Sequence, residues 1–418
     1  MKLSQAASAL FPRLRAKLSH AVSALYPAFR MKLSPVVLAL LFPCALIAQQ
    51  PADTTKPAPP PPAPTTTVSV PVDFSGVIYA NYQYRGDKGT AKSTNKFDLE
   101  RAYLTFRMPA GDRASIRITA DVFQQTTAPQ DAFYRGWVIR AKYAYLQYDL
   151  VKSSTWNANI RGGLLHNVVI DHIEQFWPRW LSQSPVERAG FFSSSDAGVA
   201  ATLSFPNKLG EIYANVVNGP GYTSRETDRF KDYAARLTFT PLASWDNKIL
   251  KTFALSGWTY VGAVGSQFVN GGAGQVGTVG VSMPRTRAGV FAGLRDPRLT
   301  VGAEWDTRKD GSETGANTVA SPRVEVDSTG RLIAGFITAK PFQLLNDKST
   351  FPLGLVARWD RFKPNTSNDG FINTIIGGLT FDLNKKSAIS LDYQEVTPHS
   401  GAVVAATKTY FLHLVANF

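Results

Sequence analysis

The sequence has almost no cysteine and no apolar segment long enough to cross a bilayer as a helix. Cys44 is the single cysteine among 418 residues, which excludes a disulfide framework and a cysteine metal site. The apolar run 36–48 is too short for a spanning helix and is interrupted by Pro43. These absences argue against a disulfide-rich secreted domain and against a helical membrane protein.

Helical periodicity is also almost absent from about residue 69 onward. Short segments alternate apolar and polar residues, and clusters of Gly, Pro, Asn and Asp separate them. The hydrophobic fraction of 44% suits a soluble protein, but it equally suits a β-barrel with a polar interior and an apolar outer wall. The pattern along the chain therefore has to decide between the two.

The first 68 residues differ from the rest. Residues 1–48 hold six basic residues and no acid, so the remainder carries +8 of the formal net charge of +14. A fifteen-residue unit repeats three times, and its third copy, from Met31, has the basic start, apolar run and small Ala48 of a signal peptide. We interpret the earlier copies as a duplication upstream of the true start, with a basic amphipathic arm as the alternative. Residues 49–68 are rich in Pro and Thr and are expected to form an extended periplasmic spacer, which leaves 69–418 as the folded domain.

Two-faced alternation is clearest on both sides of a tight turn at 109–112. Segments of this kind, each near the roughly 9–11 residues that a tilted transmembrane strand needs, number about sixteen. The sequence therefore predicts an all-β fold, a closed antiparallel transmembrane barrel. The expected strands are 72–84, 97–108, 114–124, 138–149, 155–164, 196–205, 210–218, 229–240, 250–262, 285–295, 298–308, 331–340, 351–361, 371–382, 387–396 and 407–418.

The connections between these strands alternate short and long. Bacterial outer-membrane barrels have short periplasmic turns and longer outer loops, and a soluble sandwich has no reason to sort its loops this way. Both termini are therefore expected on the periplasmic side. The long connections are 85–96, 125–137, 165–195, 219–228, 263–284, 309–330 and 397–406.

The carboxyl end is the sharpest single signal. Counting back from Phe418, every second residue is apolar, and another aromatic stands near the far end of the strand. This arrangement resembles the terminal signal that the assembly machinery of outer-membrane barrels reads. The residues of this assembly signal are Tyr410, Leu412, Leu414, Ala416 and Phe418.

The segment FDLERAYLTFRMPAGDRASIRITADV (97–122), with the later 163–200 region, resembles the phosphate-selective porin O/P family of outer-membrane porins. The shared features are an arginine-bearing strand, a short turn, a second strand, and a long third loop leading into Asp196. The resemblance implies a trimeric sixteen-stranded barrel, a third loop folded inward as a constriction, and lumenal basic residues that guide anions. The Pro-rich spacer departs from the family, and the family's breadth leaves the solute open.

Six arginines lie on the expected lumen face, and two interpretations remain open for them. Guanidinium groups match phosphate oxygens in a bidentate fork and raise the local anion concentration. Alternatively, they pair with lumen acids such as Asp121, Glu304 and Asp360 and only shape the pore. The candidate pore-lining and anion-binding residues are Arg101, Arg107, Arg117, Arg161, Arg236 and Arg358.

The third loop, 165–195, is expected either to line a constriction or to form an outer loop packed by its own aromatics, with a short helix within 167–181. His166, Asp171, His172 and Glu174 lack a persuasive metal-binding spacing, so no metal is expected. The candidate constriction residues are His166, His172, Glu174, Arg179 and Arg188.

We therefore expect an outer-membrane porin, not an enzyme, that passes small hydrophilic solutes passively and prefers anions such as phosphate. The alternatives are a barrel enzyme, for which His172 and Ser193 to Ser195 are the candidate residues, and a structural or adhesive barrel. The expected partners are outer-membrane lipid, the barrel-assembly machinery, small anionic solutes and two further copies in a homotrimer. Neither a cofactor nor nucleic acid is expected.

Overall fold

The structure is a computed structural model that describes residues 71–86, 95–124, 136–226, 228–265, 282–314, 320, 324–402 and 404–418. The signal peptide, the duplicated segment and the spacer expected in 1–68 lie outside the described residues. The described elements all belong to one compact unit, Val68–Phe418.

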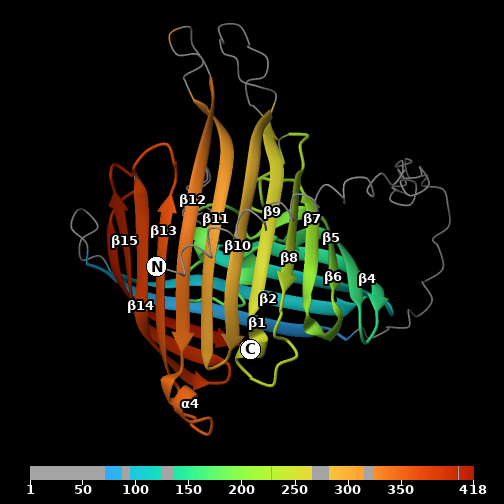
Figure 1. The fold of residues 1–418 in the computed structure, drawn as a ribbon, viewed down its shortest axis with the longest axis vertical. Coiled ribbons are helices and arrows are strands. Elements are labelled where there is room, and N and C mark those ends of the chain that lie inside the picture. Colours follow the sequence, from blue (N-terminus) through green and yellow to red (C-terminus); the bar gives the residue numbers. More distant parts are fainter. Residues whose placement is uncertain are drawn as a thin grey trace, which may run out of the picture. The chain divides into compact units, whose positions relative to one another are not determined.

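Sixteen antiparallel strands close into one barrel (Figure 1). Each strand pairs with its neighbours in sequence, and the first and last strands pair with each other from Val77↔Asn417 to Arg85↔Thr409. The all-β fold class and the strand number are therefore confirmed. The strands are β1 (Asp73–Arg85), β2 (Asn95–Pro109), β3 (Ala114–Gln124), β4 (Trp137–Lys152), β5 (Asn157–His166), β6 (Ser195–Ser204), β7 (Gly210–Val217), β8 (Asp232–Phe239), β9 (Ala254–Gly265), β10 (Ser282–Asp296), β11 (Leu299–Thr314), β12 (Val324–Ala339), β13 (Leu353–Lys363), β14 (Phe371–Asn384), β15 (Ser387–His399) and β16 (Thr407–Asn417).

The wall has an apolar outer face and a polar inner face, as the alternation predicted. In β13, Leu355 and Trp359 are exposed on the outside, whereas Arg358 and Asp360, the residues on either side of Trp359, are buried inside. An apolar belt on a closed barrel is the arrangement that spans an outer membrane, because closure pairs the backbone polar groups of neighbouring strands. The expected outer-membrane location is therefore confirmed.

The last residue extends the seam between β16 and β1. The backbone N–H and C=O of Phe418 both bond to Gly76 in β1, each at 3.0 Å. Its ring lies over Gly76, where even a Cβ atom would come within 2.3 Å of it, and 5.9 Å from the ring of Phe74. Tyr410, Leu412 and Leu414 share this exposed outer face. The structure thus joins the terminal aromatic to the first strand, while its role as an assembly signal stays a prediction.

One local expectation was wrong. The outer connection expected at 309–330 is largely strand, because β11 runs to Thr314 and β12 starts at Val324; Lys309 and Asp327 form an ion pair at 2.7 Å across this extension. The short helix expected within 167–181 is present as a single turn, α2 (Ile170–Ile173), and a second turn outside that range, α3 (Pro185–Arg188), follows it.

The helical pieces are short. A further helix, α4 (Pro341–Leu345), and the 3-10 turns η3 (Pro206–Lys208) and η4 (Leu250–Thr252) occupy connections at the end of the barrel that carries the short turns. None of the helices in the described parts of the chain is long and apolar enough to cross a membrane.

Candidate functional site: the third loop and the basic wall

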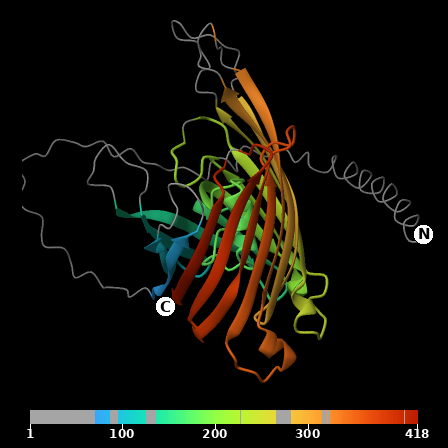
Figure 2. The same ribbon diagram turned by 90° about the vertical axis from the view of Figure 1, so that its left-hand side faces the viewer.

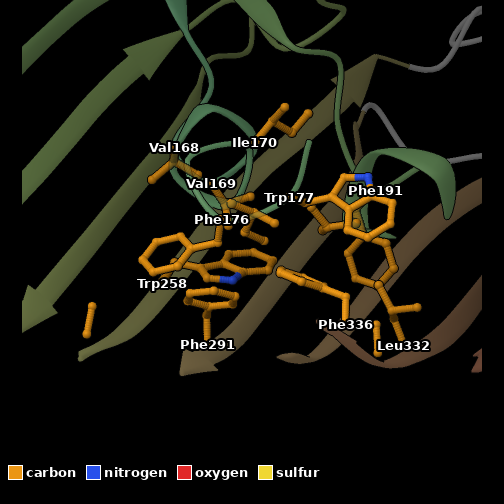
Figure 3. Close-up of a cluster of buried hydrophobic side chains, with 14 of the residues drawn as sticks. Val168, Val169, Ile170, Phe176, Trp177, Phe191, Trp258, Phe291, Leu332 and Phe336 are labelled. Carbon is orange, nitrogen blue, oxygen red and sulfur yellow. The ribbon is translucent and has the colours of Figure 1, made fainter. Parts of the chain in front are cut away.

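The third loop connects β5 to β6 and lies inside the ring of strands (Figure 1, Figure 2). Most of its apolar side chains are buried against inward residues of β9 to β14 (Figure 3). The ring centroids of Trp177 and Phe336 are 5.3 Å apart, and those of Phe176 and Phe291 are 4.8 Å apart. Burial of this apolar surface holds the loop against one side of the barrel. The inward-folded form of the loop is therefore confirmed.

Polar contacts anchor the same loop from several strands. Arg236 donates to the carbonyl oxygen of Val168, and Arg358 donates to Ser182 Oγ at 3.1 Å and to the carbonyl oxygen of Gln183. On other walls, Gln394 Nε2 donates to the carbonyl oxygen of Leu181 at 2.9 Å, and Tyr143 Oη donates to Asp171 Oδ1 at 2.8 Å. Both kinds of contact fix the position of the loop within the lumen.

Two of the six candidate arginines thus lie beneath the loop. Arg236 is 6% exposed and pairs with Glu211, and Arg358 is 2% exposed and pairs with Asp360 at 2.5 Å. Their donors are directed to loop carbonyls and to these carboxylates. The structure therefore places both residues as anchors of the third loop, with little surface left for a solute.

A second group of basic side chains gathers on a different part of the wall. Arg101, Arg117, Arg140, Lys142 and Arg161 come from β2, β3, β4 and β5 and point inward; we call them the basic wall. Asp121, fully buried, pairs with Arg101 at 3.2 Å and with Arg140 at 3.0 Å. Arg117, Lys142 and Arg161 form no ion pair with any described carboxylate. The basic wall therefore keeps a net positive charge.

Aromatic and amide groups hold these cations without neutralising them. Lys142 Nζ is 3.0 Å from the Tyr103 hydroxyl and 4.2 Å from the centre of its ring. The Arg117 guanidinium lies 4.7 Å from the ring centre of Tyr143, and Arg161 donates to Gln147 Oε1 at 2.9 Å. Such cation–π and hydrogen-bond contacts orient a cation but leave its charge in place.

His166 stands beside Arg117 at the end of β5. Arg117 Nη1 and His166 Nε2 are 2.8 Å apart. Because a guanidinium only donates hydrogen bonds, Nε2 of His166 must be the unprotonated acceptor. In this arrangement His166 is neutral and positions Arg117 rather than adding a charge.

Acidic groups of the loop and of β2 surround Arg179. Its guanidinium lies 3.0 Å from Glu100, 3.3 Å from Glu174 and 3.5 Å from Glu187. Burial raises the pKa of Glu174 to about 7, against the opposing effects of Lys142 and Arg179. Burial also lowers the pKa of Arg188 to about 10. Glu174 is therefore the loop carboxyl whose charge changes near neutral pH.

Arg107 lies away from the other candidates. It occupies the short-turn end of β2, 4.0 Å from Asp73, and its side chain is 49% exposed.

Arg140 and Lys142 belong to the basic wall, but the sequence analysis did not identify them. The alternation in β4, where Ile139 is 70% exposed, marks Arg140 as inward-facing. Alternation does not predict the position of Lys142, because a register shift at Thr119/Ala120 places both Lys142 and Tyr143 inside.

The structure brings a histidine and a serine together, though not the serines considered from the sequence. His172 Nε2 lies 2.8 Å from Ser256 Oγ, and both residues are 5% exposed beneath the aromatic cluster. Burial, with Arg236 and Arg295 nearby, lowers the pKa of His172 well below its usual value. The pair is closed to solutes and tethers α2 to β9. Among the described residues, no group of three or more His, Cys, Asp or Glu is placed to hold a metal ion.

Known structures share this fold. The chain has the fold of outer-membrane porins. It is similar to an anion-selective porin from Comamonas acidovorans (TM-score 0.57, 8% identity, 84% of this chain and 100% of that one). It is also similar to the outer membrane channel DcaP of Acinetobacter baumannii (TM-score 0.55, 13% identity, 84% and 99%) and to OprB of Pseudomonas putida (TM-score 0.56, 9% identity, 83% and 94%).

At identities this low, the likeness establishes the fold. No family model matches the sequence, and no curated protein matches it either. The coarser expectation of a porin fold is thus confirmed, whereas membership of the phosphate-selective O/P family stays a prediction.

Proposed function

We propose that the protein is a passive porin that prefers small anions, phosphate among them. The observation that carries this proposal is the basic wall, in which Asp121 pairs with Arg101 and Arg140 while Arg117, Lys142 and Arg161 form no ion pair with a described carboxylate. The anion-selective porin from Comamonas acidovorans has the same fold, which supports the proposal without deciding it. The arginines offer bidentate donors that suit phosphate or carboxylate oxygens.

The basic wall can act on solutes because its charges face the interior. Exposed surface charges are screened within roughly 10 Å at 0.1 M salt, but charges lining a narrow lumen with low-dielectric walls are screened less. Anions would then be enriched beside Arg117, Lys142 and Arg161, and cations would be depleted. The pore needs no cofactor for this selectivity.

The test is the reversal potential of the refolded protein in a planar bilayer under a salt gradient. We expect anion preference in the unmodified pore and a large loss of it in the triple variant Arg101→Gln, Arg117→Gln, Arg161→Gln, because glutamine keeps hydrogen bonding but removes the charge. A matched control removes three arginines from outside the lumen, Arg113, Arg331 and Arg361, with no expected change.

An unchanged reversal potential in the lumen triple variant would contradict the proposal, as would cation preference in the unmodified pore. The same bilayer experiment separates the alternatives, because a barrel enzyme or a structural or adhesive barrel needs no conducting lumen. A membrane without single-channel steps would favour one of those.

We further infer a homotrimer that contacts outer-membrane lipid and is inserted by the barrel-assembly machinery after export with a signal peptide starting at Met31. A similar fold, the in-vitro folded OmpT of Vibrio cholerae, is described as a trimer form, which supports this oligomer (TM-score 0.51, 11% identity). Crosslinking of the refolded protein in detergent gives the oligomer number directly.

A further inference from the structure

A cavity of about 250 Å³ lies under the third loop, on the side of the barrel away from the basic wall. The loop segment 174–180 forms one side of this cavity. The other side is the inner face of β11 to β14 at the short-turn end, one layer of residues beyond the aromatic cluster. This cavity belongs to neither the basic wall nor the loop anchors.

Three threonine side chains line the wall of the cavity. Thr300 and Thr338 stand directly opposite each other on β11 and β12, and Thr380 stands opposite Gly354 on β14 and β13. Thr300 donates to the carbonyl oxygen of Asp296 at 3.3 Å, and Thr338 and Thr380 form no side-chain hydrogen bond with another described residue. At Gly354 a Cβ atom would come within 2.4 Å of Thr380 Oγ1, so the missing side chain leaves room for that hydroxyl.

The loop side of the cavity is aromatic. Phe176, Trp177 and Trp180 line it, together with Pro178. Trp177 is fully buried, so the aromatic surface open to a solute comes mainly from the partly buried Trp180, whose ring centroid lies 6.2 Å from that of His413 in an edge-on contact. An aromatic face opposite hydroxyl groups offers an apolar platform together with hydrogen-bond partners. A solute ring with C–H groups on its faces and hydroxyl groups at its edge binds to this combination.

The charged groups at the cavity are already paired. Arg298 lies 2.8 Å from Asp296 and 2.6 Å from Asp347, and Lys340 pairs with Asp382. Glu174 pairs with Arg179 at 3.3 Å. An ionic solute would gain little net attraction here, whereas a neutral solute with several hydroxyls would find both donors and acceptors.

We propose that this cavity is a binding subsite for a neutral polyhydroxylated solute of monosaccharide size. The subsite goes beyond the anion preference proposed above, because it rests on different residues and on a different wall. A pore with both features would hold a neutral hydroxylated solute beneath the third loop, at the short-turn end of β11 to β14, and would pass anions along β2 to β5.

The probe is D-glucose, titrated against the single-channel current of the refolded protein in a planar bilayer. We expect a saturable decrease in current, and a half-blocking concentration at least fivefold higher after Thr338→Val and Thr380→Val, because valine keeps the shape and removes the hydroxyl. The matched control is Thr259→Val on the outer face of β9, for which the half-blocking concentration stays unchanged. Folding of each variant is checked by heat-modified mobility.

A decrease in current that is linear in glucose, or that is identical in the double variant and the unmodified protein, would overturn the subsite. A second readout is tryptophan fluorescence, in which glucose should cause a saturable change that Trp180→Phe reduces. The reversal potential of the arginine variants is measured without glucose, so the anion proposal and this subsite can fail separately.

Discussion

At the scale of single residues, the partner of each arginine decides what it does. Arg236 and Arg358 pair with carboxylates and donate to loop carbonyls, and both are buried. Arg117 and Arg161 lie on the same inward face of the barrel but bond to His166 and Gln147. Removing Arg358 leaves the buried carboxylate of Asp360 unpaired, which costs stability, and removing Arg236 removes a buried anchor of the loop, whereas removing Arg117 or Arg161 removes charge from the lumen.

A residue-scale prediction concerns Glu174. Its pKa of about 7 means that it is mostly neutral at pH 6 and mostly ionised at pH 8. Ionisation adds a negative charge near Lys142 and Arg179, so anion preference should fall as pH rises across this range. Reversal potentials measured at pH 6, 7 and 8 test the expectation.

Glu174→Gln fixes the neutral state, so its anion preference should stay at the low-pH value throughout that range. Glu226→Gln, in the outer connection between β7 and β8 where Glu226 pairs with Lys231, is the matched control and should retain the pH dependence. A pH dependence that survives Glu174→Gln would show that another group is responsible.

At the scale of elements, the third loop behaves like a core rather than like a surface loop. Trp177, Phe191 and Ile170 are as buried as residues of a soluble protein interior, and they replace polar lumen contacts along β9 to β14. The loop therefore divides the interior chemically. One wall is covered by apolar packing, and the wall of β2 to β5 presents cations and tyrosines.

The element-scale prediction concerns β16. Deleting Phe418 removes the ring over Gly76 and the two backbone hydrogen bonds at the end of the seam, so insertion into the membrane should fall while export continues. The measurement is the amount of heat-modifiable, folded protein in the outer-membrane fraction. Phe381→Ala, which removes another exposed outer aromatic, serves as the control. Normal levels of folded protein after the deletion would argue against a terminal signal.

At the scale of the whole molecule, an even number of strands puts both ends of the barrel wall on one rim, the rim of the short turns. If that rim faces the periplasm, an epitope inserted at the exposed turn Ser400–Gly401 should be labelled in intact cells. An epitope inserted at Gly111, between β2 and β3, should be labelled only after the outer membrane is permeabilised. Both glycines have positive φ in open turns, 80° and 112°, with no neighbour within 4 Å of a Cβ atom. The reverse labelling pattern would show that the short-turn rim faces the outside of the cell.

The sequence by itself determined the strands and their faces. Alternation is a local property, because successive side chains of a strand point to opposite sides, and a bilayer outside the barrel demands apolar residues at every second position. The segments around Gly111 and the strand that ends at Phe418 therefore show their outward residues without any knowledge of the fold. The rhythm of short and long connections follows from the same topology.

Only the tertiary structure decided what the inward residues do. Arg358 and Gln183 are far apart in sequence, as are Arg117 and His166, and no local sequence pattern predicts that either pair is in contact. The register shift in β4 that turns both Lys142 and Tyr143 inward is likewise set by pairing with β3. The third loop is buried because its aromatic residues find Phe291 and Phe336 across the lumen, a contact between distant segments that exists only once the barrel has closed.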